Sequence, residues 1–252
     1  GVSDKLGWTT GTTMIDINND GYLDIYVCKS GSLTDHQLRE NLLYINQGDH
    51  TFKQQAREWG LNDTGFGTQA YFLDYDKDGD LDMYLLNNSL RPVGGFDIRP
   101  GLRDIRDPFG GNKLYRNELI SKERTVRTSS SDSSNVPKFT DVTESANIYS
   151  SNIGYGLGVT IGDVNKDGWQ DLHISNDFFE RDYLYLNNQD GTFSETLTDQ
   201  MNSISGASMG ADMANVNNDG HNDLFVTEML PNDYERLKKV TTFEDWNRYQ
   251  YG

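Results

Sequence analysis

Short apolar runs alternate with dense polar turns along most of this chain, an alternation that predicts β-strands and turns rather than helices. The clearest runs are rich in Tyr, Ile, Val and Phe, residues that suit a pleated, half-buried surface. Each of them directly follows an acidic turn, and they occupy residues 23–27, 81–86, 171–174 and 223–227. Segments containing Gly with aromatic or small residues precede the same turns, at 7–8, 65–67, 154–156 and 208–210. We therefore expect each turn to connect two strands of a hairpin.

A second pattern follows the first three hairpins. It places Asn or Asp at its start, Tyr three residues later and Asn two residues after that, at 41–46, 112–117 and 182–187. Turn-forming residues come after it, and Asp190-Gly191 predicts a two-residue turn between extended segments. Each unit then contains four antiparallel strands in about 50–60 residues, which is typical of a propeller blade. The predicted fold class is all-β, a single partial β-propeller domain over residues 1–252 with about four blades.

Two segments depart from this repeat. Residues 91–138 form an insertion in the second unit and contain ten of the 22 basic residues. We interpret the insertion as a solvated loop that docks on the acidic body, with partner binding as the alternative. Residues 233–252 are expected to form a helical connector, because Leu237, Val240 and Phe243 recur at helical spacing.

The acidic turns are four copies of one nine-residue pattern, with oxygen-bearing side chains at positions 1, 3 and 5, Gly at position 6 and Asp at position 9. We call them loop I (16–24), loop II (74–82), loop III (163–171) and loop IV (215–223). Positions 1, 3, 5 and 9 are Asp16, Asn18, Asp20 and Asp24, then Asp74, Asp76, Asp78 and Asp82, then Asp163, Asn165, Asp167 and Asp171, and finally Asn215, Asn217, Asp219 and Asp223. Four copies with fixed internal spacing indicate one shared function.

Alternate oxygen ligands followed by a glycine that allows a sharp reversal are typical of a Ca²⁺ loop. We expect position 9 to supply a bidentate carboxylate and position 7 a backbone carbonyl, since Tyr22, Asp80, Trp169 and His221 share no side-chain chemistry. An EF-hand or dockerin loop would need an acidic position 12, where this chain has Val27, Leu85, Ile174 and Val226. Asx turns without metal stay an alternative. Up to four Ca²⁺ ions are expected, bound most tightly by loop II, which has four ligand carboxylates, and least by loop IV, which has two.

The composition supports bound cations. The chain has 252 residues, 39 acidic against 22 basic side chains and a net charge of −17. Asp outnumbers Glu 29 to 10, and short acids favour tight turns. An acidic protein of this kind repels nucleic acid, and no apolar run is long enough for a transmembrane helix. The sequence begins without an initiator Met, and we expect it to be part of a longer protein.

These loops behind Gly-aromatic strands resemble FG-GAP/VCBS repeats, which also form the propellers of integrin α-subunits. The runs at 176–193, 208–210, 217–227 and 229–231 resemble cartilage-acidic-protein-like surface proteins with an ASPIC/UnbV domain, including surface lipoproteins of Bacteroidota. The resemblance implies a seven-bladed, calcium-loaded propeller, of which about three blades lie outside this sequence. It also implies an extracellular or cell-surface location, as in an outer-membrane lipoprotein.

We expect a ligand-binding or adhesion module for a glycan or a protein, rather than an enzyme. Long connections at 29–40, 88–112 and 176–182 carry aromatic and amide side chains that either contact a ligand or pack between blades, among them Phe96, Asn176, Phe178 and Phe179. One alternative is a Ca²⁺-dependent polysaccharide lyase or hydrolase, with candidate residues at 91–116 and at His173, although no catalytic spacing is present. The other alternative is a structural subunit of a surface complex.

Overall fold

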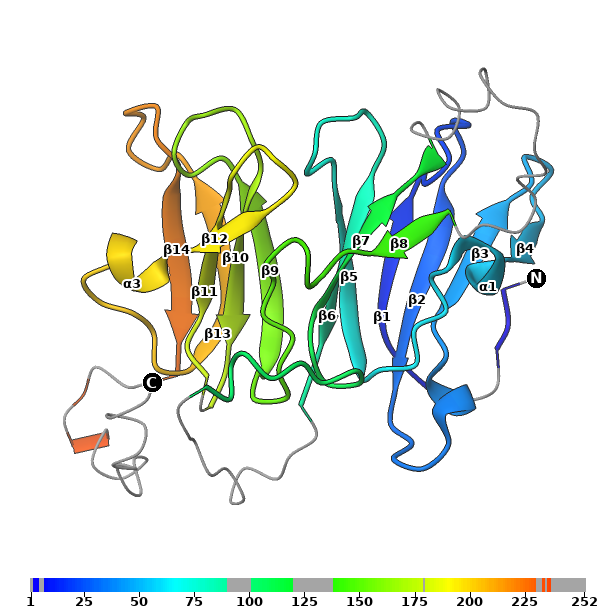
Figure 1. Cartoon of the computed structure of the whole chain (residues 1–252), viewed down its shortest axis with the longest axis horizontal. Coiled ribbons are helices and arrows are strands. Elements are labelled where there is room, and N and C mark those ends of the chain that lie inside the picture. Colours follow the sequence, from blue (N-terminus) through cyan, green and yellow to red (C-terminus); the bar gives the residue numbers. More distant parts are fainter. Residues whose placement is uncertain are drawn as a thin grey trace.

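Four antiparallel sheets stand side by side along the molecule, each built from consecutive segments of the chain (Figure 1). The structure is a computed structural model that describes residues 2–4, 7–89, 101–119, 138–178, 180–229, 233 and 235–236. Most of the insertion at 91–138 and of the connector at 233–252, with Phe96 and Phe179, lies outside these residues. We number the sheets as blades 1 to 4 in chain order.

Blades 1, 2 and 3 have four strands each, in sequential order, as the repeat predicts. Blade 1 contains β1 (Trp8–Ile15), β2 (Asp24–Ser30), β3 (Leu42–Asn46) and β4 (Phe52–Gln54). Blade 2 contains β5 (Gly67–Leu73), β6 (Asp82–Asn87), β7 (Lys113–Asn117) and β8 (Phe139–Asp141). Blade 3 contains β9 (Gly156–Gly162), β10 (Asp171–Asn176), β11 (Tyr183–Asn187) and β12 (Phe193–Glu195).

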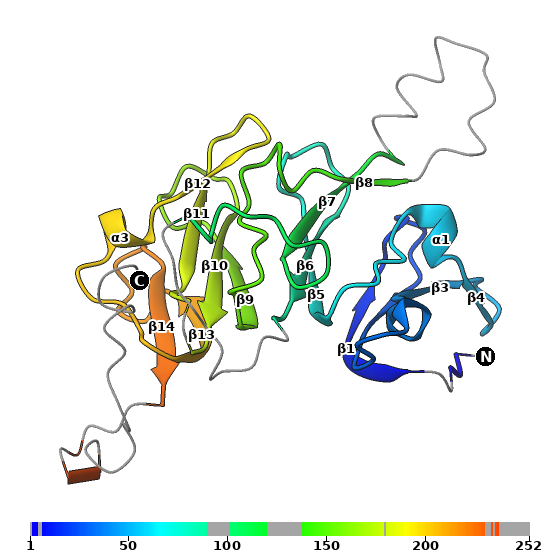
Figure 2. The same cartoon turned by 60° about the horizontal axis from the view of Figure 1, so that its bottom comes forward.

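Blade 4 has two strands among the described residues, β13 (Ser208–Ala214) and β14 (Asp223–Glu228). The third-strand pattern does not recur after this hairpin, which agrees with the sequence analysis. Phe225 on β14 is 69% exposed, whereas Tyr84 at the same place in blade 2 is fully buried against blade 3. The described blades form an open arc of an all-β propeller, not a closed ring (Figure 2).

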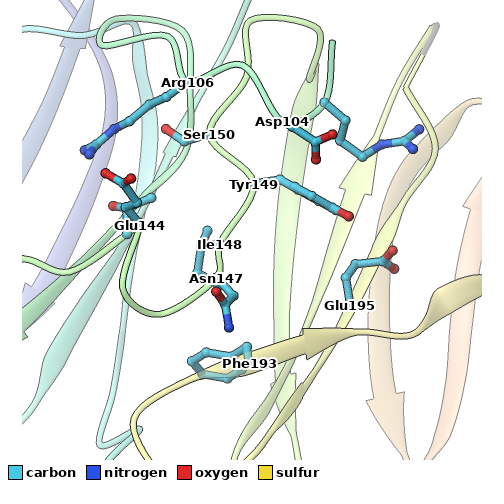
Figure 3. Close-up of a pocket in the computed structure, with 11 residues that line it drawn as sticks. Asp104, Arg106, Glu144, Asn147, Ile148, Tyr149, Ser150, Phe193 and Glu195 are labelled. Atoms are coloured by element: carbon cyan, nitrogen blue, oxygen red, sulfur yellow. The ribbon is translucent and has the colours of Figure 1, made fainter. Parts of the chain in front are cut away.

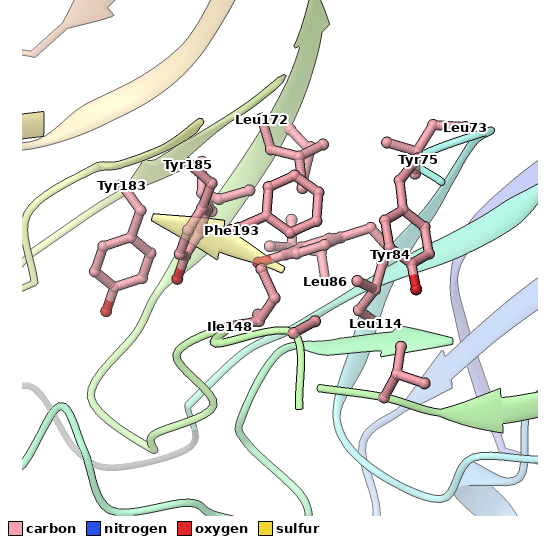
Figure 4. Close-up of a cluster of buried hydrophobic side chains, with 14 residues drawn as sticks. Leu73, Tyr75, Tyr84, Leu86, Leu114, Ile148, Leu172, Tyr183, Tyr185 and Phe193 are labelled. Atoms are coloured by element: carbon pink, nitrogen blue, oxygen red, sulfur yellow. The ribbon is translucent and has the colours of Figure 1, made fainter. Parts of the chain in front are cut away.

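Apolar side chains from facing sheets form the core between consecutive blades. Because strand residues alternate in direction, Met83 and Leu85 of β6 pack toward blade 1 while Tyr84 and Leu86 pack toward blade 3. All six β6 positions are therefore buried. Figure 4 shows the cluster between blades 2 and 3, in which Tyr185 and the fully buried Leu172 belong to blade 3. The buried apolar side chains thus form one cluster between blades 1 and 2 and another between blades 2 and 3.

Hydroxyl groups add hydrogen bonds between the first strands of neighbouring blades. Thr13 on β1 donates to the carbonyl of Ala70 on β5 at 2.8 Å, and Thr160 on β9 donates to the carbonyl of Ala211 on β13 at 2.9 Å. The two threonines occupy the same place in their hairpins. These contacts fix the position of one blade along the strand direction of the next, and so align their loops.

Two local predictions were wrong. The sequence analysis expected no helix outside 233–252, yet helices α1 (Ala56–Trp59) and α3 (Leu197–Gln200) follow the fourth strands of blades 1 and 3, and a 3₁₀ helix η1 (His36–Arg39) follows β2. Each is about one turn long, too short to show a periodic pattern. The helical connector at 233–252 itself stays a prediction. The Asp190-Gly191 turn is part of a longer connection over 188–192, closed by a hydrogen bond from the amide of Asn188 to the carbonyl of Thr192. No helix among the described residues is long and apolar enough to cross a membrane.

We predict that Asn187→Ala lowers the free energy of unfolding by about 2 kcal/mol, because two carbonyls lose their buried donor. The Asn187 amide donates across the blade boundary to the carbonyl of Tyr75 at 2.8 Å and within its own blade to that of Gln170 at 3.3 Å. Asn188→Ala is the matched control, with an exposed side chain, and should cost less than about 0.5 kcal/mol. Urea unfolding measures both, and equal losses would contradict the role given to Asn187.

Candidate metal-binding loops

The four acidic loops are the hairpin turns β1–β2, β5–β6, β9–β10 and β13–β14, and they lie along the same side of the sheets (Figure 1). Their backbones are alike. Position 4 is left-handed in all four, with φ of 57° at Asn19, 57° at Lys77, 61° at Lys166 and 60° at Asn218. Glycine at position 6 has φ between 81° and 98°, a region that other residues rarely adopt. The spacing therefore encodes one turn, repeated four times.

The carboxylate at position 5 has the same local role in every copy. It accepts the backbone N–H of position 7, at 2.9 Å in loop I (Asp20), 3.1 Å in loop II (Asp78), 2.8 Å in loop III (Asp167) and 2.8 Å in loop IV (Asp219). This Asx turn uses only the backbone N–H of position 7, not its side chain. Tyr22, Asp80, Trp169 and His221 can therefore differ without changing the turn.

Loop II brings three carboxylates together. One oxygen each of Asp74, Asp76 and Asp78 lies within 4.8 Å of the others, and no other group of this kind occurs among the described residues. The Oδ1 atom of Asp74 is buried and accepts no hydrogen bond. Burial and the charge of Asp78 raise the pKa of both Asp74 and Asp76. A divalent cation would relieve this repulsion and supply the missing partner of Asp74.

Loops I, III and IV differ at position 3, where asparagine replaces aspartate. In each, the asparagine side chain donates a hydrogen bond to the position 5 carboxylate: Asn18 to Asp20 at 2.8 Å, Asn165 to Asp167 at 3.0 Å and Asn217 to Asp219 at 3.0 Å. The amide nitrogen thus neighbours the carboxylate, where a cation would need the amide oxygen. Binding in these loops requires the amide to rotate, whereas loop II already presents only oxygen atoms.

The aspartate at position 9 links the loop to the rest of its blade. Its Oδ2 atom accepts the N–H of position 2, from Ile17 to Asp24 at 3.2 Å, Tyr75 to Asp82 at 3.2 Å, Val164 to Asp171 at 2.8 Å and Val216 to Asp223 at 3.0 Å. In blades 1 to 3 its Oδ1 atom accepts the N–H of the third-strand asparagine, from Asn46 at 2.7 Å, Asn117 at 2.8 Å and Asn187 at 2.8 Å. Its bidentate metal binding stays a prediction.

Burial makes these aspartates sensitive to their charged neighbours. Desolvation is the main cause that raises the pKa of Asp24, Asp82 and Asp171. Burial raises the pKa of Asp82 to about 9; like charge on Asp76 and Asp80 adds to the shift, and the backbone N–H groups counteract only part of it. Without a cation, the ionised form of Asp82 is therefore strongly disfavoured.

Sequence reasoning missed the partner of position 9. The asparagine that ends the second repeated pattern donates through its backbone to that aspartate and through its side chain to the position 8 carbonyl, at 3.1 Å in blades 1 and 2 and 3.3 Å in blade 3. The signal was present in the sequence, because Asn46, Asn117 and Asn187 recur at one place in each unit. The two repeated patterns form one hydrogen-bonded unit.

A separate cleft lies where residues 103–106 meet the connection 143–150 after β8 and the outer strand β12 of blade 3. Its volume is about 380 Å³, within the usual range of ligand pockets. Figure 3 shows Tyr149 and Glu195 on one side and Arg106 and Glu144 on the other. Arg103 pairs with the buried Glu180 at 2.8 Å. The cleft combines an aromatic ring with fixed polar groups, a composition suited to binding.

Two of the catalytic or ligand-contact residues proposed from the sequence, His173 and Asn176, are buried. His173 is 1% exposed and lies 3.4 Å from a carboxylate oxygen of Asp182, so its ring is not available to a substrate in this structure. Asn176 is also buried and donates to the carbonyl of Arg181 at 2.9 Å. Phe178 is 39% exposed and packs edge-on against Tyr155. Only Phe178 of these three offers an accessible surface.

The FG-GAP-like repeat profile matches residues 16–85 and 163–226, together just over half of the chain. The chain belongs to this family of repeat proteins. No curated protein matches it. One similar solved structure is the exotype rhamnogalacturonan lyase YesX, with a TM-score of 0.42, 14% sequence identity and coverage of 86% of this chain. The chain spans only 38% of the length of that structure.

We predict that, in the presence of calcium, Asp78→Ala lowers the melting temperature by several degrees because loop II loses a central ligand. Asp219→Ala in loop IV should lower it by no more than about 2 °C, since that loop has fewer carboxylates and its blade contributes less core. Differential scanning calorimetry measures both changes. Equal decreases would show that loop II has no special role.

Proposed function

We propose that this chain is a calcium-binding propeller module that displays ligand-binding surfaces outside the cell. The observation that carries the proposal is loop II, where three aspartates converge around a buried oxygen with no hydrogen-bond partner. Oxygen-only ligands on a flexible turn suit Ca²⁺ better than Mg²⁺, which prefers a stricter octahedron and keeps more water. Four ions would neutralise about half of the net charge of −17.

The chemistry of the other loops supports an extracellular setting. Loops I, III and IV are largely exposed at positions 3 to 6, and each contributes a neutral asparagine in place of a carboxylate. Fewer charged ligands on an exposed turn favour weak binding, with a Kd of roughly 10⁻⁴–10⁻³ M, the range of extracellular calcium modules. Such loops would be filled only where calcium is abundant, and a surface location, including attachment as a lipoprotein, is part of the proposal.

Calcium would act on binding indirectly, by stiffening the hairpins that hold the blades in register. The ligand would contact the connections between strands, with the cleft around Tyr149 as the leading site. Tyr149 lines the cleft with a partly exposed side chain, while Arg103 and Glu195 are fixed by ion pairs with Glu180 and Arg181 at 2.8 Å and 2.6 Å. Fixed donors and acceptors beside a ring suit a glycan or a peptide, and binding without turnover is the expected behaviour.

We predict that a chelator destabilises the protein by removing calcium, and that added calcium restores the stability of the metal-free form. Titration calorimetry should detect between one and four Ca²⁺ ions, and saturation of one site at 100 times its Kd should stabilise the fold by about 2.7 kcal/mol. Magnesium at the same concentration should give a smaller rise in melting temperature. Absence of both heat and thermal shift with calcium would contradict the proposal.

We further predict that glycan and peptide arrays identify a ligand whose binding weakens about tenfold or more in Tyr149→Ala, because the variant loses the aromatic side chain that lines the cleft. Leu33→Ala, an exposed residue outside the cleft, is the control. Release of unsaturated sugar products would instead indicate a lyase. Binding only to other protein chains, unaffected by Tyr149→Ala, would indicate a structural subunit.

A further inference from the structure

Two lysines occupy an unfavourable place in the acidic loops. Lys77 and Lys166 stand at position 4 of loops II and III in the left-handed region, at φ of 57° and 61°. Asparagine adopts this conformation more readily than lysine, and loops I and IV have Asn19 and Asn218 there. The backbone alone does not explain lysine at these two positions, so the side chains are the features to examine.

Lys77 extends across the blade boundary into the next loop. Its Nζ atom lies 4.5 Å from the centre of the Trp169 ring at position 7 of loop III. The same ammonium is 3.6 Å from the point where a Cβ atom would stand on Gly168, at position 6. Lys77 also interacts electrostatically with Asp167, the position 5 carboxylate of loop III. Its charge is therefore directed toward the neighbouring loop.

Lys166 repeats this arrangement one blade further along. Its Nζ atom is 3.4 Å from the corresponding Cβ point on Gly220 of loop IV, and it interacts electrostatically with Asp219. The side chain of Asn222 in loop IV also donates to the carbonyl of Asp163 in loop III at 3.0 Å, so these loops are in direct contact. Two copies thus place an ammonium beside the position 6 glycine of the next loop, where its charge acts on the position 5 carboxylate.

Loop II receives no such lysine, because position 4 of the preceding loop is Asn19. The charged neighbours of Asp76 include Asp78, Asp74, Asp82 and Arg116, and Arg116 is paired with Glu118 at 2.7 Å within the same blade. Loop II, which has the most carboxylates, therefore extends a lysine to loop III but receives none from loop I. The asymmetry separates loop II from loops III and IV.

We infer that Lys77 and Lys166 are built-in counter-charges that set the cation affinity of the following loop. This inference rests on the proposed calcium function. The two lysines have opposite effects on the metal-free and the calcium-bound protein. In the metal-free form, each ammonium offsets repulsion among the carboxylates of the next loop. In the presence of calcium, the same ammonium repels the ion and weakens its binding. Loops III and IV then fill only after loop II.

Lys77→Asn tests the inference with little risk to the fold, since asparagine is the natural residue at position 4 of loops I and IV. The probe is terbium, which occupies calcium sites. Excitation of a tryptophan side chain produces luminescence from a terbium ion bound close to it. Trp169 stands at position 7 of loop III and also borders Asp76 of loop II. An ion in loop II therefore gives an early step and an ion in loop III gives the later step, whose midpoint is measured; Trp169→Phe should abolish both. We expect Lys77→Asn to lower the terbium midpoint about three- to fivefold, with a difference that shrinks as sodium chloride is added.

Two further variants separate charge from shape. Lys77→Arg keeps the positive charge and should keep the midpoint of the unaltered protein. Lys53→Asn removes an exposed lysine that contacts Glu58 on blade 1 at 3.9 Å, and it should also leave the midpoint unchanged. The metal-free form of Lys77→Asn should melt at a lower temperature than the unaltered protein, because loop III loses its internal counter-charge.

The outcomes distinguish the inference from the calcium function. Terbium binding with the same midpoint in Lys77→Asn and the unaltered protein would overturn the inference alone. A shift of equal size in Lys77→Arg or in Lys53→Asn would also overturn it, since the effect would then not come from the charge at this place. Failure of terbium and calcium to bind at all would overturn the proposed function and the inference with it.

Discussion

The hydrogen bonds of a single buried aspartate hold each complete blade together. Asp24, Asp82 and Asp171 are fully buried at the start of the second strand, and each accepts backbone N–H groups from its own loop and from the end of the third strand. Removing a carboxylate from water is costly unless such donors satisfy it. The turn, the second strand and the third strand therefore form as one unit. Blade 4 shows the contrast, because Asp223 has the loop donor but no third strand among the described residues.

This arrangement concentrates negative charge at one side of the propeller, and the loops manage that charge in different ways. Loops I, III and IV place an asparagine N–H against the position 5 carboxylate, and loops III and IV also receive a lysine from the preceding loop. Loop II instead gathers Asp74, Asp76 and Asp78. A cation in loop II would complete the sequence of counter-charges along this side.

Much of the fold was predictable from the sequence, because its repeated patterns reflect repeated local physics. Gly21 and its equivalents predicted the hairpin turns, and the apolar runs that follow predicted β2, β6, β10 and β14, all of which the structure confirms. Helices α1 and α3 were missed because a helix of one turn is too short to show a periodic pattern of apolar residues. The turn at 188–192 is longer than predicted because the Asp190 carboxylate accepts from the hydroxyl of Thr192 at 2.6 Å inside the turn that the Asn188–Thr192 backbone bond closes.

The candidate site was predictable in its residues but less so in its detail. Spacing identified every loop position, yet it could not show that Asn18 would turn its amide nitrogen, not its oxygen, toward Asp20. Nor could spacing show that Lys77 would reach Trp169, 92 positions away in the chain, since that contact depends on how two blades pack. Contacts within a hairpin follow from local sequence, whereas contacts between hairpins follow from the assembled sheets.

The most direct measurement is an anomalous difference map from crystals of this chain grown with calcium and then exchanged for terbium. The expected result is a peak in loop II bound by Asp74, Asp76 and Asp78 that is at least as strong as any peak in the other three loops. A map with no peak in loop II, and with those three carboxylates held by water or by backbone N–H groups alone, would contradict the central role of a cation there.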